Sequence, residues 1–210
     1  TEDRRTEDRG QMAEGMRISR PILKAVFIFI ISYLLFLILW LQVKDYYALA
    51  ITEVASRIVT VIKDVRLEYL TQKKDIIEVT FSPLRQNIRA FGDILIDIPV
   101  KTSSYTFNAP LTLSIMAGLY PFLRKRLRGY LEAILILIVV HLLYVSSLEA
   151  MELTGVFISR GIEPAKGLKV MFYEFLWGFT DNMVIRFEPF LIGFYLFIKY
   201  RTVSLLSKII

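Results

Sequence analysis

The sequence predicts an α-helical polytopic membrane protein of about four transmembrane helices, with both termini inside and a small extracytoplasmic α+β domain after the first span. Three observations lead to this fold class. Hydrophobic residues make up 55% of the 210-residue chain, against about 45–50% in soluble domains. Long apolar runs recur, and basic clusters border them. The densest cluster, which is retained on the cytoplasmic side and thus determines the topology, comprises Arg124, Lys125, Arg126 and Arg128.

The charge balance and the residue types narrow the functional classes. The net charge is +6, but the basic clusters adjoin apolar runs, which favours contact with anionic lipid headgroups over nucleic acid. Cysteine is absent, so disulfides, thiolate metal sites and a cysteine nucleophile are excluded. The chain has neither a glycine-rich phosphate loop nor a G-x-S-x-G pattern. We therefore expect a non-enzymatic protein without a cofactor.

Residues 1–15 form a charged tail, and residues 16–43 form the first transmembrane anchor. Thr1-Glu2-Asp3-Arg4 recurs as Thr6-Glu7-Asp8-Arg9, and this polar repeat without an apolar anchor predicts disorder. The tail is either translated upstream sequence or a solvated cytoplasmic segment. Residues 21–43 are apolar over roughly 30 Å of helix, which is enough to cross a bilayer.

Residues 44–108 are expected to form the extracytoplasmic α+β domain. Apolar residues recur at three- and four-residue steps, which predicts an amphipathic helix continuing from the first span to about Asp64. This apolar line consists of Tyr47, Ile51, Val54, Ile58, Val61 and Val65. We expect the line to pack on the domain's own sheet. The alternative is a docking face for a partner helix.

A period of two then predicts three short strands. Residues 65–69 and 77–81 alternate in polarity around the polar turn Gln72-Lys73-Lys74-Asp75, which indicates a β-hairpin. A third strand is expected at 94–100, after the break at 91–93. Three strands and a helix can bury a small core, which a lone hairpin cannot.

Residues 109–210 are expected to form a membrane domain with three further spans. Asn108-Ala109-Pro110 begins a short apolar helix at 111–123, because proline is tolerated in a first helical turn. This run is short for a span and must borrow length from its flanks. The basic cluster is followed by a strongly apolar run at 130–147, which is expected to cross the bilayer in the opposite direction.

An aromatic segment precedes the last span. Residues 168–179 are apolar but too short to cross a bilayer, so we expect them to lie in the interface or to re-enter it. Their aromatic side chains suggest an interfacial belt of Tyr173, Phe175, Trp177 and Phe179. The last span, at 183–200, is followed by basic residues without a nearby acid.

His141 is the only histidine and lies inside the third predicted span. Ionisable groups in a bilayer are costly and often functional, so one interpretation is a haem ligand or a proton relay. The chain offers no second histidine and no cysteine as a companion ligand. The other interpretation is therefore a neutral histidine bonded to a neighbouring helix.

Two further groups of charged residues are candidates for partner or polar contacts. Glu149 and Glu152 share a predicted helical face, where paired carboxylates serve acid–base chemistry or bind a cation. They also fit a solvated last turn. Asp181, Arg186 and Glu188 cluster where the last span begins. These three either pair with one another or contact a partner or substrate.

Two short motifs and the order of the segments resemble a known family. Asn108-Ala109-Pro110-Leu111 leads into the second span, and Glu188-Pro189-Phe190 marks the last one. From Met16 to about Arg201 the chain resembles the exosortase H-associated membrane proteins. The resemblance implies an accessory protein of the bacterial inner membrane with an exosortase-like membrane partner. It provides no catalytic residues, because exosortases use a cysteine and this chain has none.

We therefore expect a non-enzymatic inner-membrane accessory protein associated with protein sorting or envelope processing. Its extracytoplasmic domain and aromatic segment would engage the partner. The alternative is a small transporter or membrane substrate-binding subunit acting as an oligomer, with His141 and the Arg186/Glu188 pair lining a path. A third hypothesis is a membrane enzyme that uses Glu149, Glu152 and Asp181.

Overall fold

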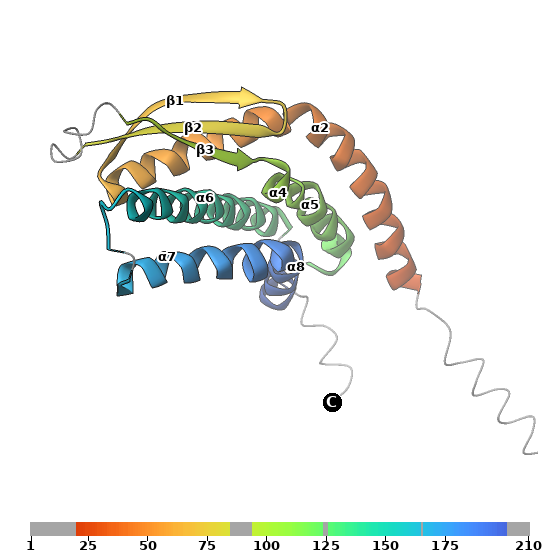
Figure 1. Cartoon of the computed structure of the whole chain (residues 1–210). Coiled ribbons are helices and arrows are strands. Elements are labelled where there is room, and N and C mark those ends of the chain that lie inside the picture. Colours follow the sequence, from red (N-terminus) through yellow and green to blue (C-terminus); the bar gives the residue numbers. More distant parts are fainter. Residues whose placement is uncertain (1–19, 85–93, 124–125, 165, 201–210) are drawn as a thin grey trace, which may run out of the picture.

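The computed structural model describes residues 20–84, 94–123, 126–164 and 166–200, which are mostly helical with one small sheet (Figure 1). The coarser part of the predicted fold class, a mostly helical chain with one small sheet, is thereby confirmed. Two helices, α2 and α6, are long and apolar enough to cross a membrane. In chain order the elements are α2 (Arg20–Lys63), β1 (Val65–Lys73), β2 (Ile76–Pro83), β3 (Ile96–Lys101), α4 (Ser103–Thr106), α5 (Asn108–Leu119), the 3₁₀ turn η1 (Tyr120–Phe122), α6 (Arg126–Ser159), α7 (Leu168–Phe179), the π-helical turn η2 (Thr180–Val184) and α8 (Ile185–Tyr200).

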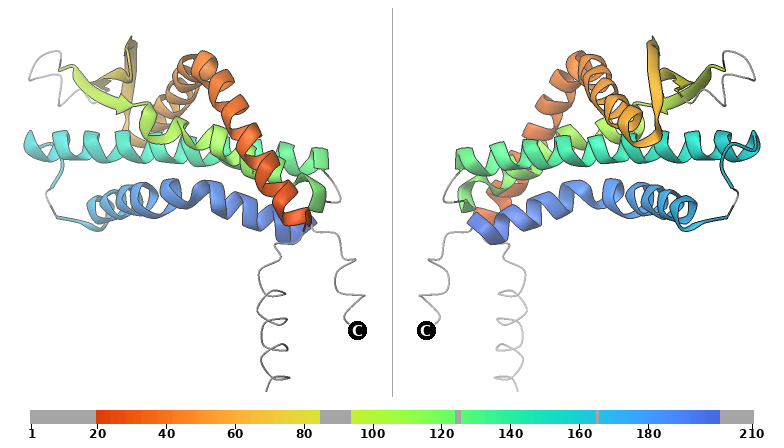
Figure 2. Two further views of the ribbon diagram at one scale, coloured as in Figure 1. Left: turned by 90° about the vertical axis from the view of Figure 1, so that its right-hand side faces the viewer. Right: turned by 90° about the vertical axis from the view of Figure 1, so that its left-hand side faces the viewer.

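Helix α2 joins the predicted first span and the predicted amphipathic helix in 44 continuous residues. It ends where Asp64 adopts a φ of 55°, a left-handed conformation that commonly terminates helices. The helix is bent, so that its second half lies beside the sheet and α6 (Figure 2). Along the first half most apolar side chains between Ile22 and Val43 are exposed, as expected for a helix that faces lipid.

The second half of α2 buries only part of the predicted apolar line: Ile51, and Val65 just after the helix, lie in the core with the sheet. The other buried residues of this half are mostly small: Ala48, Thr52, Ala55, Ser56 and Val59. Small side chains allow two helix backbones to approach closely, and this stripe lies against α4 and α6. Val54, Ile58 and Val61 are exposed. The expectation that the apolar line packs on the sheet is therefore wrong for these three residues.

The predicted hairpin and third strand are confirmed. The three strands form an antiparallel sheet in the order β1-β2-β3. The turn is tighter than expected, because β1 runs to Lys73 and β2 begins at Ile76. The inner face of β2 and β3 is apolar and packs in one core with α2 and α6; it consists of Ile77, Val79, Phe81, Ile96, Ile98 and Val100. The predicted break at 91–93 lies outside the described residues.

Helix α6 is longer than the predicted span at 130–147. It contains 34 residues, and Leu153 and Phe157 in its second half join the core beneath the sheet. The predicted domain at 44–108 therefore shares its core with α6, a helix of the predicted membrane domain.

The helices α7 and α8 continue each other through η2, antiparallel to α6 (Figure 2). Trp177 of α7 packs against Tyr144, near the middle of α6, with the two rings tilted by 53°. Lys199 of α8 bonds to Glu132, near the start of α6. The predicted interfacial segment at 168–179 thus runs on into the predicted last span without turning back.

The helix ends that were expected in the cytoplasm lie together at one end of the molecule (Figures 1 and 2). Gly118 of α5 lies against Ala25 and Phe29 of α2. Glu132 of α6 accepts hydrogen bonds from Lys199 (2.9 Å) and Tyr200 (2.6 Å) of α8. Arg126 and Arg128 belong to the first turn of α6, whereas Arg124 and Lys125 lie outside the described residues.

Candidate functional site

Four helices meet at a buried polar group of side chains around His141, which we name the His141 junction. It consists of Tyr47 from α2, Asn108 from α5, His141 from α6 and Glu188 from α8. The side chains of His141 and Glu188 are fully buried. Among the predicted candidates, the structure therefore brings His141 and Glu188 together.

His141 bridges two helices through its two ring nitrogens. Its Nε2 lies 3.2 Å from Oε2 of Glu188, and its Nδ1 lies 2.7 Å from the hydroxyl of Tyr47. A carboxylate oxygen accepts hydrogen bonds, so in the tautomer with the proton on Nε2 this nitrogen donates to Glu188 and Nδ1 accepts from the hydroxyl of Tyr47. A single neutral tautomer satisfies both contacts. This arrangement matches the interpretation of a histidine bonded to neighbouring helices.

Asn108 connects the two short motifs, which are 80 residues apart. Its Nδ2 donates to the carbonyl oxygen of Ile185 (2.5 Å) and to Oε2 of Glu188 (2.9 Å). Pro189 lies inside α8 and has no N–H, so the carbonyl four residues earlier lacks its helical donor. That carbonyl belongs to Ile185. Asn108 thus supplies the hydrogen bond that the proline removes.

Glu149 is buried beside α2 and bonds to Ser56. The hydroxyl of Ser56 lies 2.7 Å from the carbonyl of Thr52 and 2.8 Å from Oε1 of Glu149. One hydroxyl proton cannot make two strong hydrogen bonds. Both contacts are satisfied when Glu149 is protonated and donates to Ser56. A neutral carboxyl also avoids the large penalty of burying an unpaired charge.

Within each of the two predicted groups of charged residues, the side chains have different surroundings. Glu152 is exposed, whereas Glu149 is fully buried. The expectation that both lie in a solvated last turn is wrong for Glu149, because α6 continues past residue 147 and α2 covers this side chain. Arg186 is exposed and Glu188 points inward; residues two apart on a helix do not face each other. Asp181 is half-buried in η2.

Helix α7 presents an apolar face to the outside. Its exposed residues follow helical spacing: Leu168, Met171, Phe172, Phe175 and Phe179. Tyr173 is buried and Trp177 is half-buried against Tyr144, with ring centroids 5.1 Å apart. The predicted aromatic belt is thus divided, since Phe175 and Phe179 face outward whereas Tyr173 and Trp177 face the protein.

Sequence reasoning missed the roles of Tyr47 and Asn108. The available signal was Pro189, because a proline inside a helix requires a donor for the freed carbonyl.

No group of three or more His, Asp or Glu side chains in the described ranges could hold a metal ion. No family model, curated protein or solved structure matches the chain.

Proposed function

We propose that the protein is a non-enzymatic accessory subunit of the bacterial inner membrane, and that it binds a membrane partner through the exposed face of α7. Leu168 is 85% exposed and Phe175 is 67% exposed. Helix α7 extends α8 beyond the predicted last span, and exposed Glu174 and Asn182 border the apolar face. Exposed apolar patches with a polar rim typically mark interaction sites. This face is the observation that carries the proposal.

The arrangement of the helix ends supports a four-span topology with both termini inside. The basic ends of α2, α6 and α8 lie together, and the sheet extends toward the opposite end (Figure 1). Exposed polar pairs lie on the sheet: Lys73 pairs with Glu78, and Ser82 donates to Glu68. Such a surface suits water. Reporter fusions in the 74–75 turn and beside Arg128 are expected to lie in opposite compartments; a shared compartment contradicts this topology.

The resemblance to exosortase H-associated proteins suggests an exosortase-type sorting enzyme as the partner. In this role the α7 face and the sheet would hold the partner, and its substrate, near the outer surface of the bilayer. The exposed residues Val54, Ile58 and Val61 of α2 form a second apolar line outside the predicted spans. The His141 junction would keep α2, α5, α6 and α8 in register, and therefore keep α7 in position.

Affinity purification of the full chain from membranes in a mild detergent tests this function. The unmodified protein is expected to recover a membrane enzyme. Replacing Phe172 and Phe175 by serine is expected to abolish recovery at normal expression, because the exposed apolar face is lost. Leu127→Ser is the matched control, since Leu127 is 75% exposed but lies at the opposite end. Recovery of the chain alone, or equal recovery with the double variant, contradicts the proposal.

The His141 junction favours a second candidate, a small transporter or membrane substrate-binding subunit that acts as an oligomer. A hydrogen-bonded series of Tyr47, His141 and Glu188 contains groups that can exchange protons. His141→Leu removes the central group. An unchanged cellular phenotype with that variant excludes a proton path, whereas a loss of uptake at normal expression supports it.

A further inference from the structure

Glu149 places a carboxyl group inside the contact between α6 and α2. The residue is 0% exposed, and Thr52, Ala55 and Ser56 on the facing stretch of α2 are fully buried as well. Its Oε1 lies 2.8 Å from the hydroxyl of Ser56, whereas its Oε2 is buried without a hydrogen-bond partner. One hydroxyl group is therefore the only polar contact of this carboxyl.

The hydroxyl of Ser56 has a second neighbour, the carbonyl oxygen of Thr52 at 2.7 Å. A carbonyl oxygen only accepts hydrogen bonds, so the single proton of the hydroxyl serves this contact. The hydroxyl oxygen is then an acceptor toward Glu149. A protonated Glu149 donates to it, whereas an ionised Glu149 has no donor of its own.

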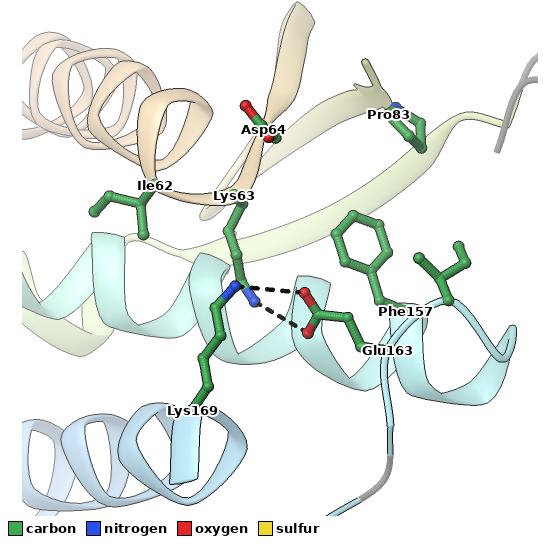
Figure 3. A pocket seen from close by; sticks show the side chains of 8 residues that line it. Ile62, Lys63, Asp64, Pro83, Phe157, Glu163 and Lys169 are labelled. Atoms are coloured by element: carbon green, nitrogen blue, oxygen red, sulfur yellow. Dashed lines mark ion pairs between the residues drawn. The ribbon is translucent and has the colours of Figure 1, made fainter. Parts of the chain in front are cut away.

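The nearby cations of α2 and α7 are directed elsewhere. The side chain of Arg57 is 71% exposed. Lys63, two turns beyond Ser56, points to the carboxylate of Glu163 at 3.6 Å, and Lys169 lies 3.7 Å from the same carboxylate (Figure 3). In the described part of the chain, neither helix thus supplies a counterion for Glu149.

The other elements around Glu149 supply no positive charge either. Tyr105 of α4 lies within electrostatic reach of Glu149 and is neutral at physiological pH. The inner face of the sheet is apolar. The titratable groups on the α7–η2 segment, besides Lys169, are Tyr173, Glu174 and Asp181. An ionised Glu149 would therefore be a buried charge without compensation, which is costly.

We propose that Glu149 is a pH-sensitive contact between α2 and α6. The folded protein holds a proton on this carboxyl at neutral pH, and loss of the proton loosens the packing of α2 on α6. In the topology proposed above, residue 149 lies on the extracytoplasmic side, so the medium outside the membrane sets this equilibrium. The contact is independent of the α7 face and of any membrane partner.

Infrared spectroscopy of the purified full chain in detergent, at neutral pH, tests the protonation state. Glu149→Gln is expected to remove the C=O stretching band of one protonated carboxyl group. Glu152→Gln is the matched control, because Glu152 is exposed and its replacement is expected to remove only carboxylate bands. Loss of a carboxylate band alone in Glu149→Gln overturns the proposal.

Ser56→Ala provides a second variant, which keeps the carboxyl group and removes its acceptor. The band assigned to Glu149 is expected to move to higher wavenumber, because the hydrogen bond that weakens the C=O bond is lost. An unchanged carboxyl region in this variant overturns the proposal. If Glu149→Gln does not fold, this comparison still decides the protonation state.

Unfolding by denaturant between about pH 5 and pH 8 tests the switch. A folded state that holds one more proton than the unfolded state loses stability as the pH rises. The unfolding equilibrium constant of the unmodified protein is therefore expected to rise by up to about tenfold per pH unit relative to that of Glu149→Gln. Glu152→Gln is expected to follow the unmodified protein. A ratio to Glu149→Gln that stays constant over this range overturns the switch.

Discussion

Replacing Asn108 by alanine tests whether its amide compensates for the proline in α8. In the structure this amide donates to the carbonyl of Ile185 and to the carboxylate of Glu188. Asn108→Ala removes both hydrogen bonds: the Ile185 carbonyl is left unpaired, whereas Oε2 of Glu188 keeps its contact with His141. The unpaired carbonyl costs about 1–3 kcal/mol, and the lost hydrogen bond to the carboxylate costs about 1–3 kcal/mol more. We therefore expect the free energy of unfolding to fall by about 2–6 kcal/mol.

A second substitution separates the two contributions. Pro189→Ala restores a backbone N–H that can donate to the Ile185 carbonyl, as in an ordinary helix. In the Asn108→Ala background it is expected to recover about 1–3 kcal/mol. The recovery must exceed the effect of Pro189→Ala in the unmodified protein, because the two positions share one acceptor. Such non-additivity is the signature of a direct interaction.

Reversible unfolding of the four proteins in mixed detergent micelles measures this cycle. Asn182→Ala is the matched control, because the exposed amide of Asn182 donates to the carbonyl of Gly178 within its own helix. Its effect is expected to stay within about 0.5 kcal/mol. If Pro189→Ala changes the stability equally in both backgrounds, the compensation described above is refuted.

Three further predictions concern stability. His141→Leu removes the hydrogen bonds to Tyr47 and Glu188 and is expected to lower the free energy of unfolding by about 2–4 kcal/mol, measured in the same assay; a loss no larger than that of Asn182→Ala contradicts it. Gly193→Ala is expected to lower Tm, because the added Cβ lies 2.6 Å from Cγ2 of Ile115, whereas Gly178→Ala meets nothing within 4 Å and is expected to raise Tm slightly. Burial raises the pKa of Asp75, but hydrogen bonds from Ser103 and Thr102 outweigh it and hold the pKa below the usual 3.8. The stabilisation by this carboxylate is therefore present above pH 3.8 and lost as the pH falls through the folded value. Melting curves should show Asp75→Asn less stable at neutral pH and closer to the unmodified protein in acid; a constant difference would argue against it.

Periodicity was sufficient to predict much of the fold. The continuation of α2 to Lys63 and the hairpin follow from repeats of 3.6 and 2 residues, which depend on local side-chain patterns. The buried face of α2 could not be found in this way, because Ala48, Ala55 and Ser56 contribute little to an apolar pattern. They are buried because small side chains permit close packing, and that depends on the partner helix.

The candidate site was predictable in its ionisable members but not in its geometry. His141 and Glu188 were identifiable as polar residues within apolar runs. Their contact joins positions 47 residues apart, and nothing local to either one indicates the other. The prediction that Arg186 pairs with Glu188 relied on their closeness in the sequence, whereas the helix directs the two side chains to different faces.

The widened turn at Thr180–Val184 sets the rotational phase between α7 and α8. A π-helical turn accommodates an additional residue relative to an α-helix, and each residue rotates the helix by about 100°. Deleting one residue from this turn would preserve a continuous helix while rotating α8 relative to α7. Glu188 would then leave His141 while the aromatic face kept its direction. The five residues of this turn thus set the angle between the inward-facing carboxylate of Glu188 and the outward-facing surface of α7 along one continuous helix.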